Sequence, residues 1–200
     1  MSTKSRILEK ALELFNEEGV AALSAVDIAT ALGISPGHLY YHFKGRSEIV
    51  AALAAEYRSE VDMVLDALTD TLGADGASLE TLWTYVHILI EEAWDARFLY
   101  REAAALVMRS QDLAAVFRYV ATRERTTLAT VLIDLRRGGV ISASPEVIDG
   151  VSRLMTTGIG FHAIELELEG DAGPQRERIA RAAAQVMLLP AALIRGGQKA

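Results

Sequence analysis

Residues 33–49 read GISPGHLYYHFKGRSEI, and this stretch decides how the N-terminal part of the chain folds. Ser35 is a good helix N-cap, and Pro36 follows it in the first turn, where a missing N–H has no cost. Leu39 and Phe43 are spaced as on one side of a helix, while the tyrosines and histidines between them are polar aromatics. The stretch therefore predicts a helix of about two turns, with a buried side and a polar aromatic side.

The residues before this stretch predict two more helices. Apolar residues recur with the helical period in residues 7–15, and Gly19 ends this first helix. Ser24-Ala-Val-Asp27 has the form of a capping box and opens a second, short helix through Leu32. Gly33 then lets the chain turn. A short helix, a glycine turn and another short helix form the helix-turn-helix pattern. The side chains expected to form the buried core of this motif are Leu12, Phe15, Ile28, Leu32, Ile34, Leu39 and Phe43.

The rest of the chain also predicts helices. Strong helix formers dominate, and alternating β-branched residues are scarce. A long helix is predicted from about residue 46 to 72, where Gly73-Ala-Asp-Gly76 breaks it. Further helices are predicted near residues 78–94, 97–110, 112–137, 145–169 and 173–195. We therefore predict an all-α fold, with a three-helix DNA-binding domain in residues 1–48. A helical bundle would follow in residues 49–200.

The composition limits the class of protein. Hydrophobic residues make up 51% of the 200, which is enough for a buried core, and no apolar run reaches the ~18–20 residues that span a bilayer. Met1-Ser-Thr-Lys-Ser5 is not followed by an apolar segment, so we expect no secretion signal. The absence of cysteine excludes disulfides and thiol chemistry. We therefore expect a cytoplasmic protein that does not bind membranes.

The distribution of charge permits a small DNA-contacting patch. The whole chain has a net charge of −7, whereas DNA-binding domains are often basic. Residues 1–48 carry only −1 of this charge, and residues 49–200 carry −6. A protein that contacts DNA through one patch needs only that patch to be positive, and Lys44 and Arg46 lie directly after the polar aromatic helix.

The polar aromatic side of the third helix suits contact with DNA. In a helix-turn-helix the N-terminal end of the second helix of the motif faces base edges; the residues there are Pro36, Gly37 and His38. Without a side chain, Gly37 lets the backbone approach DNA closely. The next residues on this side are Tyr40, Tyr41 and His42. Their hydroxyl and imidazole groups can form hydrogen bonds with phosphates, and their ring edges can contact thymine methyl groups. Lys44 adds its charge to the positive end of the next helix dipole.

Residues 5–50 resemble the DNA-binding domain of the tetracycline-repressor (TetR) family of bacterial transcription regulators. The most specific marks are LGIS at residues 32–35 and LYYHFK at residues 39–44. The resemblance implies a variable C-terminal domain that binds a small molecule and carries a dimer interface. It places Tyr40, His42 and Lys44 at phosphate-contacting positions. It places Pro36, Gly37, His38 and Tyr41 at base-facing ones, and the helix-capping Ser24 and Ser35 complete the predicted DNA-binding set.

Three features of this helix leave alternatives open. His38 stands where the family usually has Thr, Ser or Ala, so it either gives a distinct operator preference or contacts only phosphate. Tyr41 could also be a plain surface aromatic. His38 and His42 have the spacing of a zinc site, but no carboxylate or cysteine near them completes one. We expect no metal and no cofactor.

Large aromatic side chains and two histidines are spread over the C-terminal helices. Such residues are usually core, but an apolar pocket between bundle helices is also where a ligand binds. His87 and His162 each lie in an apolar run and need a partner from protein, water or ligand. We predict a small hydrophobic effector, neutral or weakly anionic. The predicted effector-binding residues are Trp83, His87, Trp94, Phe98, Phe117, Met155, Phe161 and His162.

The last two predicted helices, near residues 145–169 and 173–195, carry more apolar surface than one subunit should expose. We expect a homodimer through these helices, with Val186 and Met187 in the interface. Such a dimer reads a palindrome with half-sites about one helical turn apart. Gly158 lies inside a predicted helix, where glycine costs up to ~1 kcal/mol against alanine, so a closely packed helix or a ligand should compensate.

These predictions describe a ligand-responsive repressor that binds a palindromic double-stranded DNA operator as a dimer and is released by the effector. An enzyme is the main rival class. The chain has no G-x-S-x-G elbow, no P-loop, no H-E-x-x-H motif and no cysteine, so we do not expect an enzyme. A dimeric scaffold with a vestigial DNA-binding domain is a third possibility that the sequence leaves open.

Overall fold

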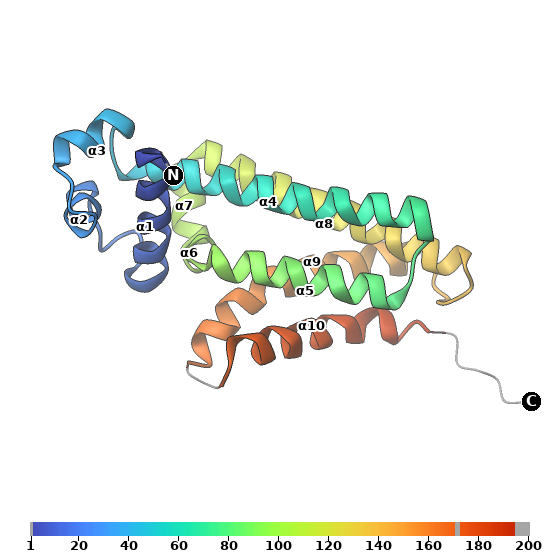
Figure 1. Cartoon of the computed structure of the whole chain (residues 1–200). Helices are drawn as coiled ribbons and strands as arrows, with labels where there is room; N and C mark the ends of the chain where they lie inside the picture. The colour runs from blue at the N-terminus through green and yellow to red at the C-terminus, as the bar shows by residue number, and fades with distance from the viewer. Residues whose placement is uncertain (1, 171–172, 195–200) are drawn as a thin grey trace, which may run out of the picture. The chain divides into compact units, whose positions relative to one another are not determined.

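A computed structural model describes residues 2–170 and 173–194. In these residues the fold is all-α, as predicted (Figure 1). The helices are α1 (Thr3–Glu18), α2 (Ala25–Ala31), α3 (Pro36–His42), α4 (Arg46–Asp75), α5 (Leu79–Asp95), α6 (Arg97–Arg101), α7 (Ala103–Arg109), α8 (Gln111–Arg137), α9 (Pro145–Leu168) and α10 (Gln175–Ala191).

The chain divides into two compact units that are each built from two stretches of sequence. The first unit combines residues 1–59 with residues 95–117, and the second combines residues 60–94 with residues 118–200. The helices α6 and α7 therefore fold together with the three N-terminal helices. The boundary between functional domains after residue 48 stays a prediction.

The three N-terminal helices share one apolar core, because α2 contacts both α1 and α3. The large side chains that are almost completely buried in this part of the chain include Ile7, Phe15, Ile28, Leu39 and Phe43. Three others that the sequence assigned to the core are only half-buried: Leu12, Leu32 and Ile34. Gly33 turns the chain between α2 and α3 with a φ of 68°, in the left-handed region that glycine adopts readily.

Two predicted helix boundaries differ from the structure. The helix expected over residues 97–110 is divided at Glu102 into α6 and α7, and this break frees the Glu102 side chain for a contact described below. The long helix continues past Gly73, and ends only where Gly76 adopts a φ of 77°. A helical glycine weakens a helix without breaking it, whereas a left-handed residue ends it.

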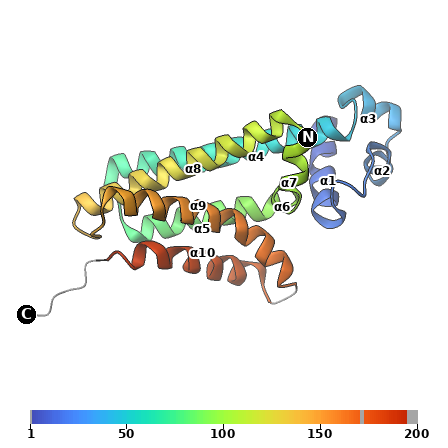
Figure 2. The same cartoon turned by 180° about the vertical axis from the view of Figure 1, so that it is seen from behind.

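In the second unit α9 and α10 run side by side (Figure 1 and Figure 2). A Cβ atom at Gly158 of α9 would lie 3.2 Å from Cγ2 of Val186 of α10, so the missing side chain lets these helices pack closely. The helix predicted over residues 173–195 spans Gln175–Ala191, and residue 195 lies outside the described residues. Among the residues that the structure describes, no helix combines the length and apolar character needed to cross a membrane.

Candidate nucleic-acid interface and effector site

The start of α3 is fixed by its own cap. The Ser35 side chain accepts a hydrogen bond from the His38 N–H at 3.2 Å, and Pro36 occupies the first turn, as predicted. On the inner side of the helix Leu39 is fully buried. The cap and the buried leucine together fix which side of α3 faces outward.

The outward side of α3 carries exposed polar aromatic residues. Tyr41 is 84% exposed and Tyr40 is 47% exposed, which is unusual for large aromatic side chains. The rings of His38 and His42 lie 5.6 Å apart, and the His42 ring packs edge-on against Tyr41 at 5.1 Å. This surface offers rings, hydroxyls and imidazoles to solvent. We call it the α3 face: His38, Tyr40, Tyr41 and His42.

Gly37 lies in the first turn of α3, beside the α3 face. A Cβ atom added there would meet no protein atom within 4 Å, and the backbone there is not left-handed. Nothing in the described part of the chain therefore requires glycine at this position, although glycine weakens a helix relative to alanine. A close approach of something outside the chain would explain the residue.

Ser24 acts as a helix cap in this structure. Its Oγ accepts from the Asp27 N–H and donates to Oδ2 of Asp27, while the Ser24 N–H donates to the same carboxylate at 2.7 Å. These hydrogen bonds with Ser24 hold the pKa of Asp27 below its ordinary value. The predicted capping box is confirmed, and a role of Ser24 in DNA binding stays a prediction.

The two basic residues after α3 differ in their surroundings. The Lys44 side chain is exposed, and its backbone N–H donates to Oε2 of Glu48 at 2.6 Å, which caps the start of α4. Arg46 is half-buried, and its Nη1 donates to the backbone carbonyls of Val20, Ala21 and Leu23. Arg46 therefore ties the loop after α1 to the start of α4, and Lys44 presents its charge to solvent.

A polar brace connects α1 to α6 inside the first unit. The buried Asn16 side chain donates to the Asp95 carbonyl at 2.7 Å and accepts from the Phe98 N–H at 3.0 Å. From α6, Arg101 Nη2 donates to the Phe15 carbonyl at 2.6 Å. Glu102 Oε1 accepts from the Val20 N–H at 2.6 Å, at the point where α6 gives way to α7. The sequence did not predict this brace. Each of its hydrogen bonds joins a side chain to a main-chain group, and every residue has such groups, so no sequence pattern marks the partners.

The predicted effector-binding residues do not all lie in one compact unit. Phe98 and Phe117 belong to the first unit, where Phe98 is fully buried with its ring 5.5 Å from that of Phe15. The other six belong to the second unit. Among those, Met155 is fully buried, whereas Trp83 is 38% and Phe161 56% exposed. Their role in effector binding stays a prediction.

The two candidate histidines lie beside acidic neighbours on their own helices. His87 Nε2 is 3.7 Å from Oε1 of Glu91, and the His87 ring lies 5.2 Å from that of Trp83. Its Nδ1 is buried and has no hydrogen-bond partner within residues 2–170 and 173–194. His162 Nδ1 is 2.5 Å from Oε2 of Glu165, in an orientation that does not form a hydrogen bond. Both histidines are half-buried.

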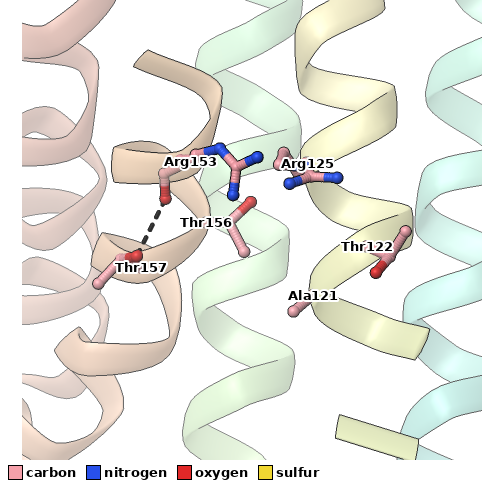
Figure 3. A pocket seen from close by; sticks show the side chains of 6 residues that line it. All are labelled: Ala121, Thr122, Arg125, Arg153, Thr156 and Thr157. Carbon is pink, nitrogen blue, oxygen red and sulfur yellow. Dashed lines mark hydrogen bonds between the residues drawn. The ribbon is translucent and has the colours of Figure 1, made fainter. Parts of the chain in front are cut away.

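An open pocket of about 310 Å³ lies elsewhere in the second unit, between α8 and α9 (Figure 3). None of the eight predicted effector-binding residues lines it. Its lining residues are Ala121, Thr122, Arg125, Arg153, Thr156 and Thr157. We call it the α8–α9 pocket. Sequence reasoning missed it, because arginines and threonines on amphipathic helices are typical of a solvated face.

Two charged residues in the second unit are buried. Glu124 of α8 is 2% exposed, and burial raises the pKa of its carboxyl to about 8. Arg178 of α10 is 8% exposed, with its guanidinium carbon 5.6 Å from the centre of the Trp94 ring and its Nε 3.6 Å from Oε2 of Glu169. Glu124 lies four residues from Val120 and from Leu128, so the helical period could have located it.

These features define a class: a helix-turn-helix protein with an exposed polar face on its second motif helix and a helical C-terminal part. Residues 7–53 match the family model described as "Bacterial regulatory proteins, tetR family", and residues 56–200 match the one described as "Bacterial transcriptional repressor". The chain belongs to the TetR family of bacterial transcriptional regulators, whose members bind DNA operators and dimerise.

Individual relatives support this assignment. The "Probable HTH-type transcriptional regulator YttP" of Bacillus subtilis is 28% identical over 105 residues, 51% of each protein. KstR2 of Mycobacterium tuberculosis, an HTH-type transcriptional repressor, is 35% identical over 89 residues, 40% of this chain and 44% of KstR2. The chain thus matches about half the length of these curated relatives. A solved TetR-family regulator from Marinobacter aquaeolei is similar with a TM-score of 0.85 at 26% identity, over 97% of this chain and 92% of that chain.

Proposed function

We propose that this chain is a cytoplasmic repressor that binds a palindromic operator as a homodimer and is released by a small hydrophobic effector. The observation that carries the DNA-binding part is the α3 face, where His38, Tyr40 and Tyr41 are exposed and His42 is half-buried. Its N-terminal end would face base edges and its C-terminal end, with Lys44, would contact phosphates. Repression is supported by the name of KstR2 and by the family model over residues 56–200. We propose no enzymatic activity.

A homodimer through α9 and α10 is supported by an apolar row on α9. Four exposed side chains follow one another at intervals of seven residues, which places them along one side of the helix. They are Val147, Leu154, Phe161 and Leu168, between 42% and 79% exposed. Leu188 of α10 is 68% exposed. A second copy would bury the row, and each copy would supply one α3 to the operator.

The effector part of the proposal rests on the Trp83 and His87 side chains of α5. The Trp83 and His87 rings lie 5.2 Å apart. The buried Nδ1 of His87 has no hydrogen-bond partner among the described residues. An apolar ligand with one polar group would satisfy that nitrogen. The solved relative KstR2 is named a ketosteroid regulator; at 18% identity it is a likeness of fold, with a TM-score of 0.74. Hydrophobic molecules are therefore the first compounds to test.

The signal would pass to α3 through helices that connect with the DNA-binding part. The helix α4 runs without interruption from Arg46 to Asp75, and the brace from α6 holds α1. An effector that favours one orientation of these helices would change the separation of the two α3 helices in a dimer. A coupling free energy of about 1–3 kcal/mol gives a change of 5–150-fold in affinity.

The test is operator affinity measured by fluorescence anisotropy, with DNA from upstream of the chain's own gene. Tyr40→Ala, His42→Ala and Lys44→Ala should each weaken binding without loss of helicity, because their polar ends are not buried in the chain. Lys44→Ala should also flatten the salt dependence by roughly one counterion per half-site. Arg137→Ala, an exposed charge at the end of α8, is the control and should bind as the wild type does. Unchanged affinity in all three α3 variants would contradict the proposal.

A further inference from the structure

The α8–α9 pocket brings two positive charges together from different helices. Figure 3 shows Arg153 extending from α9 toward α8, where the side chain of Arg125 lies. Like charges in one pocket repel, and water screens part of this repulsion because the Arg153 side chain is 59% exposed. No acidic side chain is among the lining residues.

The two arginines retain donors that the described chain does not use. Arg125 is half-buried and has no hydrogen-bond or ion-pair partner among the described residues. Arg153 Nε donates to Oδ2 of Asp149, one turn earlier on α9, at 3.0 Å, which leaves the two terminal nitrogens of its guanidinium group. A guanidinium group carries five N–H donors in a planar fork, so most of the donors of both residues remain available.

A buried hydroxyl also faces this space. Thr156 Oγ1 is buried and has no hydrogen-bond partner among the residues that the structure describes, and Figure 3 shows it pointing toward the space between the two guanidinium groups. Buried polar atoms are nearly always hydrogen-bonded. Thr122 lines the same pocket from α8 and brings a second hydroxyl.

We propose that the α8–α9 pocket binds a small anion through phosphate or carboxylate oxygens. The planar forks of Arg125 and Arg153 match such oxygens in geometry and in charge, and the Thr156 hydroxyl can donate to the same group. Bound negative charge removes the repulsion between the two arginines. A volume of about 310 Å³ is near the lower end of ligand pockets, ~300–1,000 Å³, so the anion is small.

This site is separate from the aromatic effector site proposed above, because none of its lining residues is among the eight predicted ones. Its test measures binding to the full chain without DNA. If the protein binds no anion, the DNA-binding proposal is unaffected. If it binds no operator, the anion-binding proposal is equally unaffected.

The experiment is isothermal titration of the full-length protein with sodium phosphate and, separately, with sodium succinate. Ionic strength is kept constant with sodium chloride, because bulk salt screens exposed charges. At least one of the two anions should bind saturably. Arg125→Ala and Arg153→Ala should each raise the dissociation constant about 10–100-fold, the loss of one charge-assisted contact. Arg125→Lys keeps the positive charge but loses the planar guanidinium group, so its dissociation constant should lie between those of the wild type and Arg125→Ala. Arg137→Ala should bind as the wild type does.

The outcomes separate the sources of the anion. Binding of phosphate alone identifies a phosphate-bearing ligand, and binding of succinate alone identifies a carboxylate. Saturable binding of neither anion, or equal binding by the Arg125→Ala and Arg153→Ala variants, overturns the proposal. Light scattering on the same variants gives a further decisive result. If loss of either arginine converts a dimer to monomers, the arginines bind carboxylates of a second copy of this chain and the small-anion proposal is wrong.

Discussion

At the scale of single residues, substitution of Gly37 should affect stability and DNA binding in opposite directions. A Cβ atom at this position meets no protein atom, so Gly37→Ala should raise the free energy of unfolding by up to about 1 kcal/mol. The same methyl group should hold DNA away from the backbone of α3 and weaken operator binding. Urea unfolding and anisotropy measure the two effects.

Gly73→Ala is the matched control for this prediction, because Gly73 is also helical and its Cβ position is also open. It should stabilise the protein by a similar amount and leave operator affinity unchanged. If Gly37→Ala stabilises the protein and binds DNA as tightly as the wild type, α3 does not bring its backbone close to the operator.

Glu124 makes the stability of the fold depend on pH. Burial raises the pKa of its carboxyl from 4.5 to about 8, so the folded chain keeps a proton in this range that the unfolded chain releases. Since the unfolded state then binds fewer protons, the free energy of unfolding should fall as pH rises from about 4.5 to 8. The contribution has a slope of up to about 1.4 kcal/mol per pH unit.

The neutral isostere Glu124→Gln should remove this contribution. Urea unfolding of both proteins at several pH values between 5 and 8 gives the difference, in which the other titrating groups cancel. The advantage of the wild type over Glu124→Gln should shrink steadily as pH rises. Two parallel curves would mean that the carboxyl is charged in the folded state.

At the scale of the elements, the brace between α1 and α6 should stabilise the DNA-binding part of the chain. Asn16→Ala removes one hydrogen bond to the Asp95 carbonyl and one from the Phe98 N–H, at a side chain that is 7% exposed. We expect a loss of about 1–3 kcal/mol in the free energy of unfolding, because partners are left unsatisfied. Urea unfolding followed by circular dichroism measures it.

Glu13→Ala serves as the comparison on the same helix. Glu13 forms only an exposed pair with Lys10, at 2.8 Å, and such pairs contribute about 0–1 kcal/mol. If Asn16→Ala destabilises the protein no more than Glu13→Ala does, the brace does not hold α6 to α1.

The elements also mark how far sequence reasoning reaches. Caps and helical periodicity predicted α1, α2 and α3 because Ser24, Ser35 and the buried Leu39 act within a few residues of their own helix. Nothing local to Glu102 predicted the division of α6 from α7, where the Glu102 side chain accepts a hydrogen bond from a backbone N–H 82 residues away. Main-chain partners at that distance leave no local pattern.

The candidate sites differ in the same way. The polar aromatic residues of α3 lie on one short helix, so their common exposure followed from the sequence. The α8–α9 pocket is lined by side chains from two helices. The periodicity of one helix does not show which of its residues lie opposite residues of another helix, so the pocket could not be predicted from the sequence. Val186 is a further case: its apolar character suggested a dimer interface, but it is 3% exposed and packs within the chain near Gly158.

At the scale of the whole molecule, the exposed row on α9 predicts a dimer. Leu154→Glu and Phe161→Glu place charges on a surface that a second copy would bury, and neither side chain is in the core. Each variant should keep its helicity, become monomeric and lose most of its operator affinity. Multi-angle light scattering gives the mass, and anisotropy gives the affinity.

Met63→Glu is the control for these variants, since Met63 is 62% exposed on α4, away from the row. It should remain dimeric. A wild-type protein that is monomeric at micromolar concentration, or dimeric Leu154→Glu and Phe161→Glu proteins, would contradict the interface.

The central claim is that two copies of α3 read two halves of one DNA site. The most direct test is selection of bound sequences from random double-stranded DNA by the full-length protein. The account predicts an enriched palindrome whose half-sites are centred about one helical turn apart, ~34–36 Å, and which the His42→Ala protein no longer enriches. Enrichment of no sequence, of a site without two-fold symmetry, or of the same palindrome by His42→Ala would contradict it.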